Sequence, residues 1–398
     1  MQKLKIFNGT VLTPRGRLRD GIVYVENGKI VEVSDRHTDA ADYTSVDAAG
    51  KYITPGFIDI HVHGGGNADF MDATPEAFIQ IAATHARHGT TSMTPTTLTA
   101  EASGLYKTLD AYDMVKGMQY LGADLIGMHL EGPYFALNQR GAQDPRYIRN
   151  PDPAEYRAIL DYSPHIVRWS AAPELPGAIE FGRYIKERGI LPAIAHTDAL
   201  YDDVVKARAV GYTLATHFYS AMSGVTRKDM RRYAGVIESV YLLDDIDAEI
   251  IADGVHLPAA LLQLIIKVKG IAHTVLITDA MRAAGMPPGK SILGPLEGGL
   301  EVLVDEEVAM LPDRTSFAGS IATADRLIRT MLRLAGVSLE DAVKMMTENP
   351  ARVMGIADTK GALTKDRDAD IIIFDDNINI DTTIVKGHTV YTTQTAAV

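Results

Sequence analysis

Eight apolar, strand-like runs recur along the middle of this 398-residue chain, at residues 57–63, 90–96, 124–130, 166–172, 190–196, 212–217, 247–253 and 273–279. Helix-like segments lie between most of them, for example at residues 75–88, 178–188, 201–210 and 258–269, with Pro near the start or Gly at the end. Eight such alternations over about 250–300 residues predict an α/β fold, a (β/α)8 barrel of the TIM type. The first helix is not preceded by a Gly-x-Gly-x-x-Gly motif, which argues against a doubly wound dinucleotide fold.

The two ends of the chain have a different pattern, with short strand-like runs separated by turns. Asn8-Gly9 and Asn27-Gly28 are typical hairpin turns near the start, and strand-like runs occur at residues 370–374 and 383–391 near the end. Neither end is long enough to bury a core alone. We therefore expect residues 1–54 and 355–398 to form one small β-sandwich domain, with residues 55–354 inserted as the catalytic barrel. Within the barrel, the stretch 281–320 is expected to be irregular and to precede helices at about 322–335 and 339–347.

Composition and charge exclude several classes of protein. Hydrophobic residues make up 46% of the chain, but no apolar run approaches the ~20 residues that span a bilayer. The start of the chain also lacks the apolar core of a signal peptide, so we expect a cytoplasmic protein without a membrane partner. The absence of cysteine leaves nitrogen and oxygen as the ligands for any metal. A net charge of −12 argues against nucleic acid as a partner and means that an anionic substrate requires a local basic pocket.

Polar residues end several of the predicted barrel strands. His61 and His63 end the first strand and point to the same face, because residues i and i+2 of a strand do so. The other strand-end residues are Glu131, His196, His217 and Asp279, on the third, fifth, sixth and eighth strands. The carboxyl ends of barrel strands meet at one mouth, so we expect all six side chains to converge there. We interpret His129 as a structural histidine and Trp169 as a core residue.

Four imidazoles and two carboxylates at one mouth predict a metal site. With nitrogen and oxygen ligands alone, the candidates are Zn²⁺, Fe²⁺ and Mn²⁺, as one or two ions per chain. Such an ion lowers the pKa of water toward ~7 and so supplies a nucleophile at neutral pH. The reaction still requires a residue that accepts the proton of the water and passes it to a leaving group, and Asp279 is our candidate.

These motifs carry a resemblance to a known family. Pro55-Gly56-Phe57-Ile58-Asp59, followed by His61 and His63, the later histidines and the final aspartate, resembles the amidohydrolase superfamily. More narrowly, His129-Leu130-Glu131-Gly132-Pro133, Thr216-His217, Asp253-Gly254-Val255-His256, Thr278-Asp279-Ala280 and Glu348-Asn349-Pro350-Ala351-Arg352 resemble the N-acetylglucosamine-6-phosphate deacetylase family. The resemblance implies a homodimeric, metal-dependent hydrolase that removes the acetyl group from N-acetylglucosamine 6-phosphate.

The resemblance also implies a role for individual residues. Glu131, His196 and His217 would hold the main metal, while His61 and His63 would hold a second metal with Glu131 bridging. Asp279 corresponds to the general base and acid. The implied substrate-binding residues are Ala142, Gln143, Ser220, Ala221, Arg232, Asp253, Gly254, Val255, His256, Phe317, Ala318 and Gly319. His256 and Arg232 would bind the phosphate, with Arg227, Lys228 and Arg231 as alternatives to Arg232.

Two positions depart from the family pattern. Where the family usually has Lys-Gly-Ala-His, this chain has Arg140-Gly141-Ala142-Gln143, and Ser220 stands where the family has asparagine. A glutamine amide donates a hydrogen bond but cannot carry a proton. Both changes lie among the substrate-binding residues, so N-acetylgalactosamine 6-phosphate, another N-acyl sugar or an N-acyl amino acid stay open as substrates. A barrel used only for binding is the alternative from another class, and it would be expected to lose metal ligands that this chain keeps.

Overall fold

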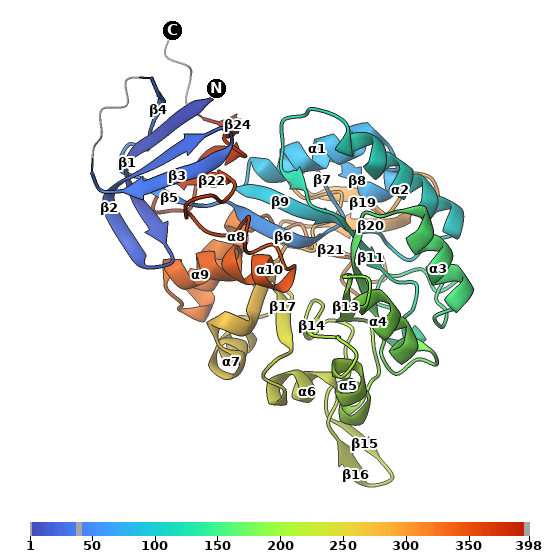
Figure 1. Ribbon diagram of the computed structural model, residues 1–398. Coiled ribbons are helices and arrows are strands. Elements are labelled where there is room, and N and C mark those ends of the chain that lie inside the picture. Colours follow the sequence, from blue (N-terminus) through green and yellow to red (C-terminus); the bar gives the residue numbers. More distant parts are fainter. Residues whose placement is uncertain (1, 37–41, 394–398) are drawn as a thin grey trace.

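In the computed structural model, which describes residues 2–36 and 42–393, the middle of the chain forms a closed ring of parallel strands (Figure 1). In ring order the strands are β6 (Phe57–Val62), β9 (Thr90–Pro95), β10 (Asp124–Leu125) with β11 (Met128–Glu131), β12 (Ile166–Ala171), β13 (Leu191–Ile194), β14 (Leu214–Ala215), β17 (Asp247–Ile251) and β18 (Thr274–Ile277). Single parallel bridges, Thr96 with His129 and Val62 with Ala280, join the two hydrogen-bonded halves. The predicted (β/α)8 barrel is therefore confirmed.

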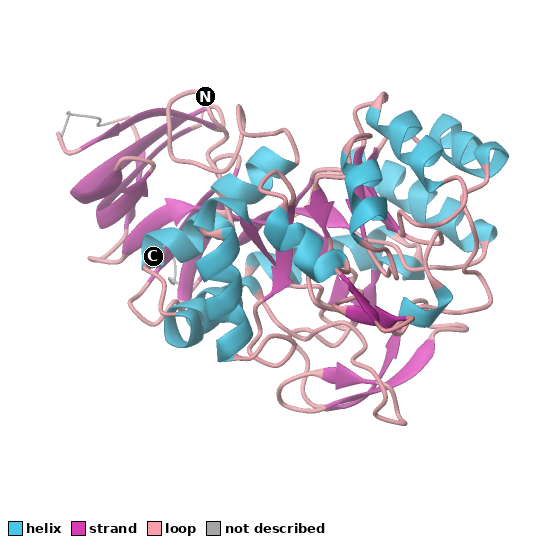
Figure 2. Cartoon of the chain, turned by 90° about the horizontal axis from the view of Figure 1, so that it is seen from below, coloured by secondary structure: helices cyan, strands magenta, loops and turns pink. Residues whose placement is uncertain are grey.

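Helices cover the outside of this ring, as Figure 2 shows for the cyan elements around the magenta strands. They are α1 (Pro75–Ala86), α2 (Ala102–Lys116), α3 (Pro153–Tyr162), α4 (Ala178–Lys186), α5 (Tyr201–Arg208), α6 (Val236–Leu242), α7 (Ala259–Lys269), α8 (Ala324–Thr330), α9 (Leu339–Met345) and α10 (Glu348–Val353). Local sequence explains their starts: Thr74 caps α1 by accepting from the Ala77 backbone N–H, and Pro75 occupies the first turn. Phe78 and Ile81 of α1 are fully buried against the strands. None of the helices in the described ranges is long and apolar enough to cross a bilayer.

The two ends of the chain share one sheet beside the barrel. Its strand order is β24-β23-β22-β5-β1-β2-β3, and β4 pairs with β1. The bounds are β1 (Lys3–Thr13), β2 (Gly16–Glu26), β3 (Lys29–Ser34), β4 (Thr44–Asp47), β5 (Tyr52–Pro55), β22 (Ile371–Phe374), β23 (Ile380–Val385) and β24 (His388–Thr392). The central pairing joins both ends of the chain, because β22 runs antiparallel to β5. A small β-domain built from both termini is thus confirmed, while its limits at residues 54 and 355 stay predictions.

Strand β22 links the cores of the two parts of the molecule. Ile371 and Ile373 pack into the core of the terminal sheet, whereas Ile372 and Phe374 belong to the barrel core. This split follows from the alternation of side chains along a strand. Close by, Lys360 is only 6% exposed and forms ion pairs with Asp370 of the terminal sheet segment and Asp124 of the barrel. The apolar and ionic contacts together fix the terminal sheet against the barrel.

Two local predictions were wrong: a hairpin turn at Asn8-Gly9 and an irregular conformation for residues 281–320. Asn8-Gly9 is a bulge inside β1 rather than a hairpin turn, because the register with β2 shifts there and Asn8 has a φ of 58°. By contrast, Asn27-Gly28 does turn the chain between β2 and β3, with φ values of 50° and 78°.

The stretch 281–320 was expected to be irregular, but it contains a small antiparallel sheet. Its strands are β19 (Gly289–Leu293), β20 (Leu300–Val304) and β21 (Ala309–Met310). Val302 and Val304 alternate with more exposed residues and pack against Leu293 and Ala309. The alternation of buried and exposed residues that is typical of a strand is therefore present in this stretch. The small sheet forms part of the wall beside the barrel mouth.

Candidate active site

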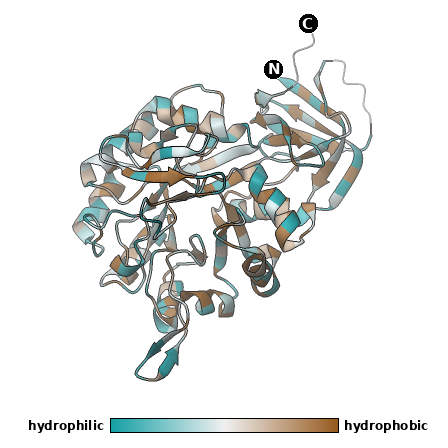
Figure 3. Cartoon of the chain, turned by 180° about the vertical axis from the view of Figure 1, so that it is seen from behind, coloured by the Kyte–Doolittle hydropathy of each residue, from teal (hydrophilic) through white to brown (hydrophobic). Residues whose placement is uncertain are grey.

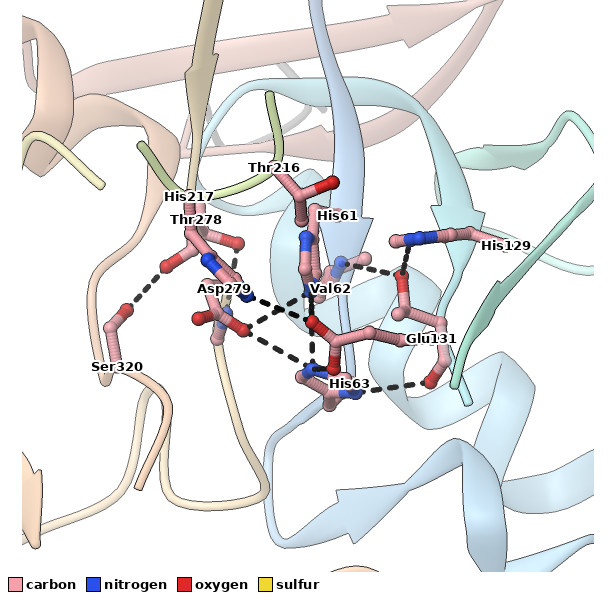
Figure 4. A network of polar contacts seen from close by, with 12 residues as sticks. His61, Val62, His63, His129, Glu131, Thr216, His217, Thr278, Asp279 and Ser320 are labelled. Carbon is pink, nitrogen blue, oxygen red and sulfur yellow. Dashed lines mark hydrogen bonds and ion pairs between the residues drawn. The ribbon is translucent and has the colours of Figure 1, made fainter. Parts of the chain in front are cut away.

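The structure brings all six predicted strand-end residues together at the mouth of the barrel. Figure 4 shows five of them: His61, His63, Glu131, His217 and Asp279. They form two groups, in each of which the possible ligand atoms lie within 4.8 Å of one another. The first group is His61, His63 and Asp279; the second is Glu131, His196 and His217. All six side chains are buried.

Glu131 lies between the two groups. Its Oε1 is 3.0 Å from Nε2 of His217, and its Oε2 is 3.4 Å from Nε2 of His63. Within the first group, Oδ1 of Asp279 lies 3.2 Å from Nε2 of His63. One carboxylate therefore faces both sets of imidazoles, which is the arrangement that a bridging ligand of two metal ions requires.

Three of these residues share an unusual backbone conformation. His196, His217 and Asp279 each follow the last residue of their strand by two positions, and their φ values are 46°, 34° and 47°. A non-glycine residue pays roughly 1–2 kcal/mol for the left-handed region. The same turn thus recurs at three strand ends, where it directs a side chain toward the mouth.

The hydrogen bonds of the histidines test whether the site fits a metal ion. Nδ1 of His63 lies 3.2 Å from the carbonyl oxygen of Thr96, and Nδ1 of His196 lies 2.7 Å from the carbonyl oxygen of Gln139. A carbonyl oxygen only accepts, so Nδ1 carries the proton in both rings and Nε2 offers its lone pair to the mouth. The donor set therefore fits a divalent cation that accepts imidazole nitrogen and carboxylate oxygen, such as Zn²⁺, Fe²⁺ or Mn²⁺.

The electrostatics of the site agree with this assignment. Burial raises the pKa of Glu131, but His61 and the other site histidines outweigh it, so that the pKa is well below its usual value. Burial likewise opposes ionisation of Asp279, and His61 and His63 again lower its pKa. Both carboxylates are therefore ionised at neutral pH. Two buried negative charges facing imidazoles are stabilised by protons or, equally, by a metal cation.

A cavity of about 810 Å³ opens above the two groups. Of the predicted substrate-binding residues, it is lined by Ala142, Gln143, Ser220, Ala221, His256, Phe317 and Gly319, together with His63, Glu131, His196, His217 and Asp279. The ring of His256 packs against that of Phe317, with centroids 4.8 Å apart. These residues come from separate loops that follow the barrel strands, so the cavity is assembled by the fold.

The other predicted substrate-binding residues do not line this cavity. Asp253 is buried behind His256, and its Oδ2 lies 2.7 Å from Nδ1 of that histidine. The backbone N–H groups of Val255 and His256 both donate to Oδ1 of Asp253. Gly254 lies in the same turn with a φ of 86°, and Ala318 is buried in the small core beneath the 281–320 sheet. These residues lie behind the wall of the cavity. Their neighbours His256 and Phe317 line the cavity itself.

Gln143 is directed toward Glu131, a predicted metal ligand. Its amide nitrogen donates to Oε2 of Glu131 over 2.6 Å, and its amide oxygen accepts from the Thr99 backbone N–H over 2.8 Å. The side chain is only 5% exposed. It therefore contacts a predicted metal ligand as well as the cavity.

Arg232 is not in the pocket of its own chain. It lies on an exposed hairpin of β15 (Thr226–Lys228) and β16 (Arg231–Tyr233), which projects from the barrel and is hydrophilic (Figures 1 and 3). Its alternatives Arg227, Lys228 and Arg231 are exposed on the same hairpin. The arginines that line the cavity are Arg140 and Arg314. The basic lining thus consists of the predicted His256 together with Arg140 and Arg314, which were not predicted.

Sequence reasoning missed the buried pair of Glu249 on β17 and Arg168 on β12, of which Glu249 contacts the predicted metal ligand His61. A signal was available, since a charged residue inside an apolar barrel strand needs a buried partner. His129 belongs to neither group; its Nε2 lies 2.7 Å from the Ser170 hydroxyl, as expected of a structural histidine. Trp169 is fully buried in the core.

Comparisons with known proteins agree with this fold and site. The model of the amidohydrolase family matches residues 52–390. The N-acetylglucosamine-6-phosphate deacetylase of Lysinibacillus sphaericus is 33% identical over 392 residues, covering 96% of this chain and 97% of that protein. The N-acetylgalactosamine-6-phosphate deacetylase of Escherichia coli O157:H7 is 31% identical, covering 95% and 96% respectively. The chain therefore belongs to the amidohydrolase family, and within it to the deacetylases of N-acetylated amino-sugar phosphates.

A solved structure supports the same relationship. The N-acetyl-D-glucosamine-6-phosphate deacetylase of Mycobacterium smegmatis, as a mutant in complex with N-acetyl-D-glucosamine-6-phosphate, superposes with a TM-score of 0.89 at 29% identity. The match covers 98% of this chain and 100% of that chain, so it includes both the barrel and the terminal sheet.

Proposed function

We propose that this protein is a metal-dependent amidohydrolase that converts N-acetylglucosamine 6-phosphate to glucosamine 6-phosphate and acetate. The observation that carries the proposal is the position of Glu131 between two groups of nitrogen and oxygen ligands at the base of a cavity. One or two divalent ions would be held there, with Zn²⁺, Fe²⁺ and Mn²⁺ as candidates. When bound, they supply an activated water and polarise the acetyl carbonyl.

Asp279 has the properties of the proton carrier in this reaction. It lines the cavity, it is ionised because His61 and His63 lower its pKa, and it stands on the same mouth as the metal ligands. An ionised carboxylate in that position accepts a proton from the attacking water. The same group, once protonated, donates to the amine nitrogen as the bond to the acetyl carbon breaks.

The phosphate of the substrate requires positive charge in a chain of net charge −12. Within the cavity we assign this role to His256, which Asp253 holds in place, with Arg140 and Arg314 as the nearby lining cations. Arg232 reaches a phosphate only if its hairpin enters the cavity of a second copy. We therefore include the predicted homodimer, and a cytoplasmic location, in the proposal.

N-acetylgalactosamine 6-phosphate is the second candidate substrate. Gln143 and Ser220 line the cavity, and both depart from the pattern of the glucosamine enzymes. The relative from Escherichia coli O157:H7 that is named for this sugar matches nearly as well as those named for glucosamine. The two sugars differ only in the orientation of one hydroxyl, which a single hydrogen-bonding side chain distinguishes.

The decisive experiment combines metal analysis with acetate release. Purified protein is analysed for metal content and assayed on N-acetylglucosamine 6-phosphate, N-acetylgalactosamine 6-phosphate, N-acetylglucosamine without phosphate, and an N-acetyl amino acid. We expect at least one divalent metal ion per chain and the highest kcat/KM on the first compound. Higher kcat/KM on the galactosamine compound would favour the second candidate. Absence of acetate release from every compound by metal-loaded protein would refute the proposal.

A further inference from the structure

His61 differs from the other site histidines in the partner of its Nδ1. The Nδ1 atoms of His63 and His196 face backbone carbonyl oxygens, but Nδ1 of His61 lies 3.0 Å from Oε1 of Glu249. Glu249 and His61 are both fully buried. A carboxylate on the far side of an imidazole fixes the ring and makes it a stronger ligand than a carbonyl does.

Glu249 is itself held by a buried arginine. Arg168 lies on β12, which β13 and β14 separate from β17 in the ring. It is fully buried, and its guanidinium Nη1 lies 2.6 Å from Oε2 of Glu249. The same guanidinium donates to the backbone carbonyl oxygen of Ile60 over 2.8 Å and to the Thr216 hydroxyl over 2.9 Å. It therefore connects Glu249 to the residue before His61 and to the residue before His217.

The pair is expensive to bury, so its presence calls for a reason. Removing two charges from water costs several kcal/mol per ion, and well-packed apolar residues often replace a buried ion pair without loss of stability. The pair stands directly below the metal ligands, and one of its members contacts only His61 among the ligand side chains. A role in the site explains this position better than a role in stability.

We propose that Glu249, held by Arg168, is a positioning residue that sets the metal affinity of the group formed by His61, His63 and Asp279. In the second group, Glu131 with His196 and His217, the contact recorded with Glu249 is a long one from the His217 backbone N–H to Oε1, over 3.4 Å, whereas in the first group the carboxylate contacts the His61 imidazole itself. The pair thus determines whether the protein works with one metal ion or two. This inference rests on the proposed metal dependence and not on the identity of the substrate.

The test uses a variant that removes the pair without leaving a buried charge. In Glu249→Leu/Arg168→Met, both charges are replaced by apolar side chains of similar volume, and His61 Nδ1 loses its acceptor. In Glu249→Gln/Arg168→Met, the amide oxygen still accepts from His61. A matched control, Asp247→Leu/Arg352→Met, removes another arginine–carboxylate pair, which also involves β17 but does not contact the site ligands.

Metal-free protein of each variant is titrated with Zn²⁺ in a calorimeter, and its fold is checked by circular dichroism. We expect wild type and control to bind two ions per chain. The Leu/Met variant should bind the second ion about 10- to 100-fold more weakly while the first stays within about threefold, and the Gln/Met variant should recover most of the loss. A Leu/Met variant with unchanged second-site affinity, or a wild type that binds a single ion at saturation, would overturn the inference. Wild type that binds no ion would instead refute the proposed function.

Discussion

Gln143 donates from its amide nitrogen to Oε2 of Glu131 over 2.6 Å, and both side chains are buried. Because its amide oxygen is also occupied, by the Thr99 backbone N–H, the amide can only be oriented one way. The carboxylate that faces both ligand groups is thus held from the substrate side by this residue. A residue that the sequence assigns to the substrate thus also contacts a predicted metal ligand.

This contact predicts opposite results for two substitutions at residue 143. Gln143→Leu leaves Glu131 Oε2 and the Thr99 N–H without their partner, so kcat/KM should fall about two- to tenfold or more. Gln143→His can donate from one ring nitrogen and accept at the other, and it should keep or raise kcat/KM on N-acetylglucosamine 6-phosphate. The measurement is kcat/KM on both sugar phosphates. Wild type inert on the glucosamine compound, with the Gln143→His/Ser220→Asn variant equally inert, would contradict our choice of substrate.

Asp279→Asn should fold normally and lose at least ~10²-fold in kcat, because an amide cannot carry the proton. The metal ion at Glu131, His196 and His217 should remain, since Asp279 is not part of that group. Steady-state kinetics and elemental analysis of the same preparation provide the check. A kcat close to that of wild type would mean that another group carries the proton.

The two ligand groups should respond differently to loss of a histidine. His196→Ala and His217→Ala each remove a ligand of the main group, so we expect loss of the main metal and of activity. His61→Ala and His63→Ala should lower occupancy of the second position and leave the main metal bound. Metal content per chain in the four purified variants decides this. Full occupancy in the first pair would exclude our ligand assignment.

Convergence of the six strand-end side chains could be predicted because it depends only on topology. Once eight parallel strands close into a ring, every strand-end residue lies at the same mouth, whatever the loops do. His196, His217 and Asp279 illustrate this, since each follows its strand by the same two positions. The terminal sheet could be predicted for a similar reason, because neither end of the chain has enough apolar surface to bury a core without the other.

The other features of the site depend on contacts between residues that are far apart in the chain, and local sequence patterns do not predict such contacts. Gln143 reaches Glu131 through the shape of the loop after β11, and Glu249 meets Arg168 across the barrel interior, 81 positions apart in the chain. The hairpin that carries Arg232 follows β14. The order of the barrel strands does not predict the direction in which this hairpin projects. Sequence reasoning therefore predicted which strand-end side chains converge at the mouth, but only part of the lining of the cavity.

His85 predicts a pH dependence of stability. It is fully buried, its Nε2 lies 2.9 Å from the Gly64 carbonyl oxygen, and burial lowers its pKa from 6.5 to about 4. Between these values the unfolded chain binds a proton that the folded protein excludes, so stability is complete above pH 6.5 and falls as the pH drops toward 4. At pH 5 the loss from this residue should be about 2 kcal/mol relative to pH 7.

The check is urea unfolding of metal-free wild type and His85→Gln at pH 7 and pH 5. Other groups titrate in this range in both proteins, so the informative quantity is the difference between them. We expect wild type to lose about 2 kcal/mol more than the variant between the two pH values. An equal loss in both proteins would mean that His85 is protonated in the folded state.

The exposed hairpin of β15 and β16 leads to the last prediction, which concerns the proposed homodimer. If Arg232 of one protomer binds the phosphate in the cavity of its partner, Arg232→Met should raise KM for the sugar phosphate roughly tenfold or more, the effect of one lost charged hydrogen bond. Mixed dimers of Arg232→Met and Asp279→Asn would then contain one complete site each, made of Asp279 from the first chain and Arg232 from the second. Random mixing should restore about a quarter of the wild-type sites, although each variant alone is impaired.

Arg314→Met is the matched control for this experiment. Arg314 lines the same cavity as Asp279 of its own chain, so Asp279→Asn should not complement it. Unchanged KM in Arg232→Met, or equal failure of both mixtures, would exclude a role for the hairpin in a partner's site.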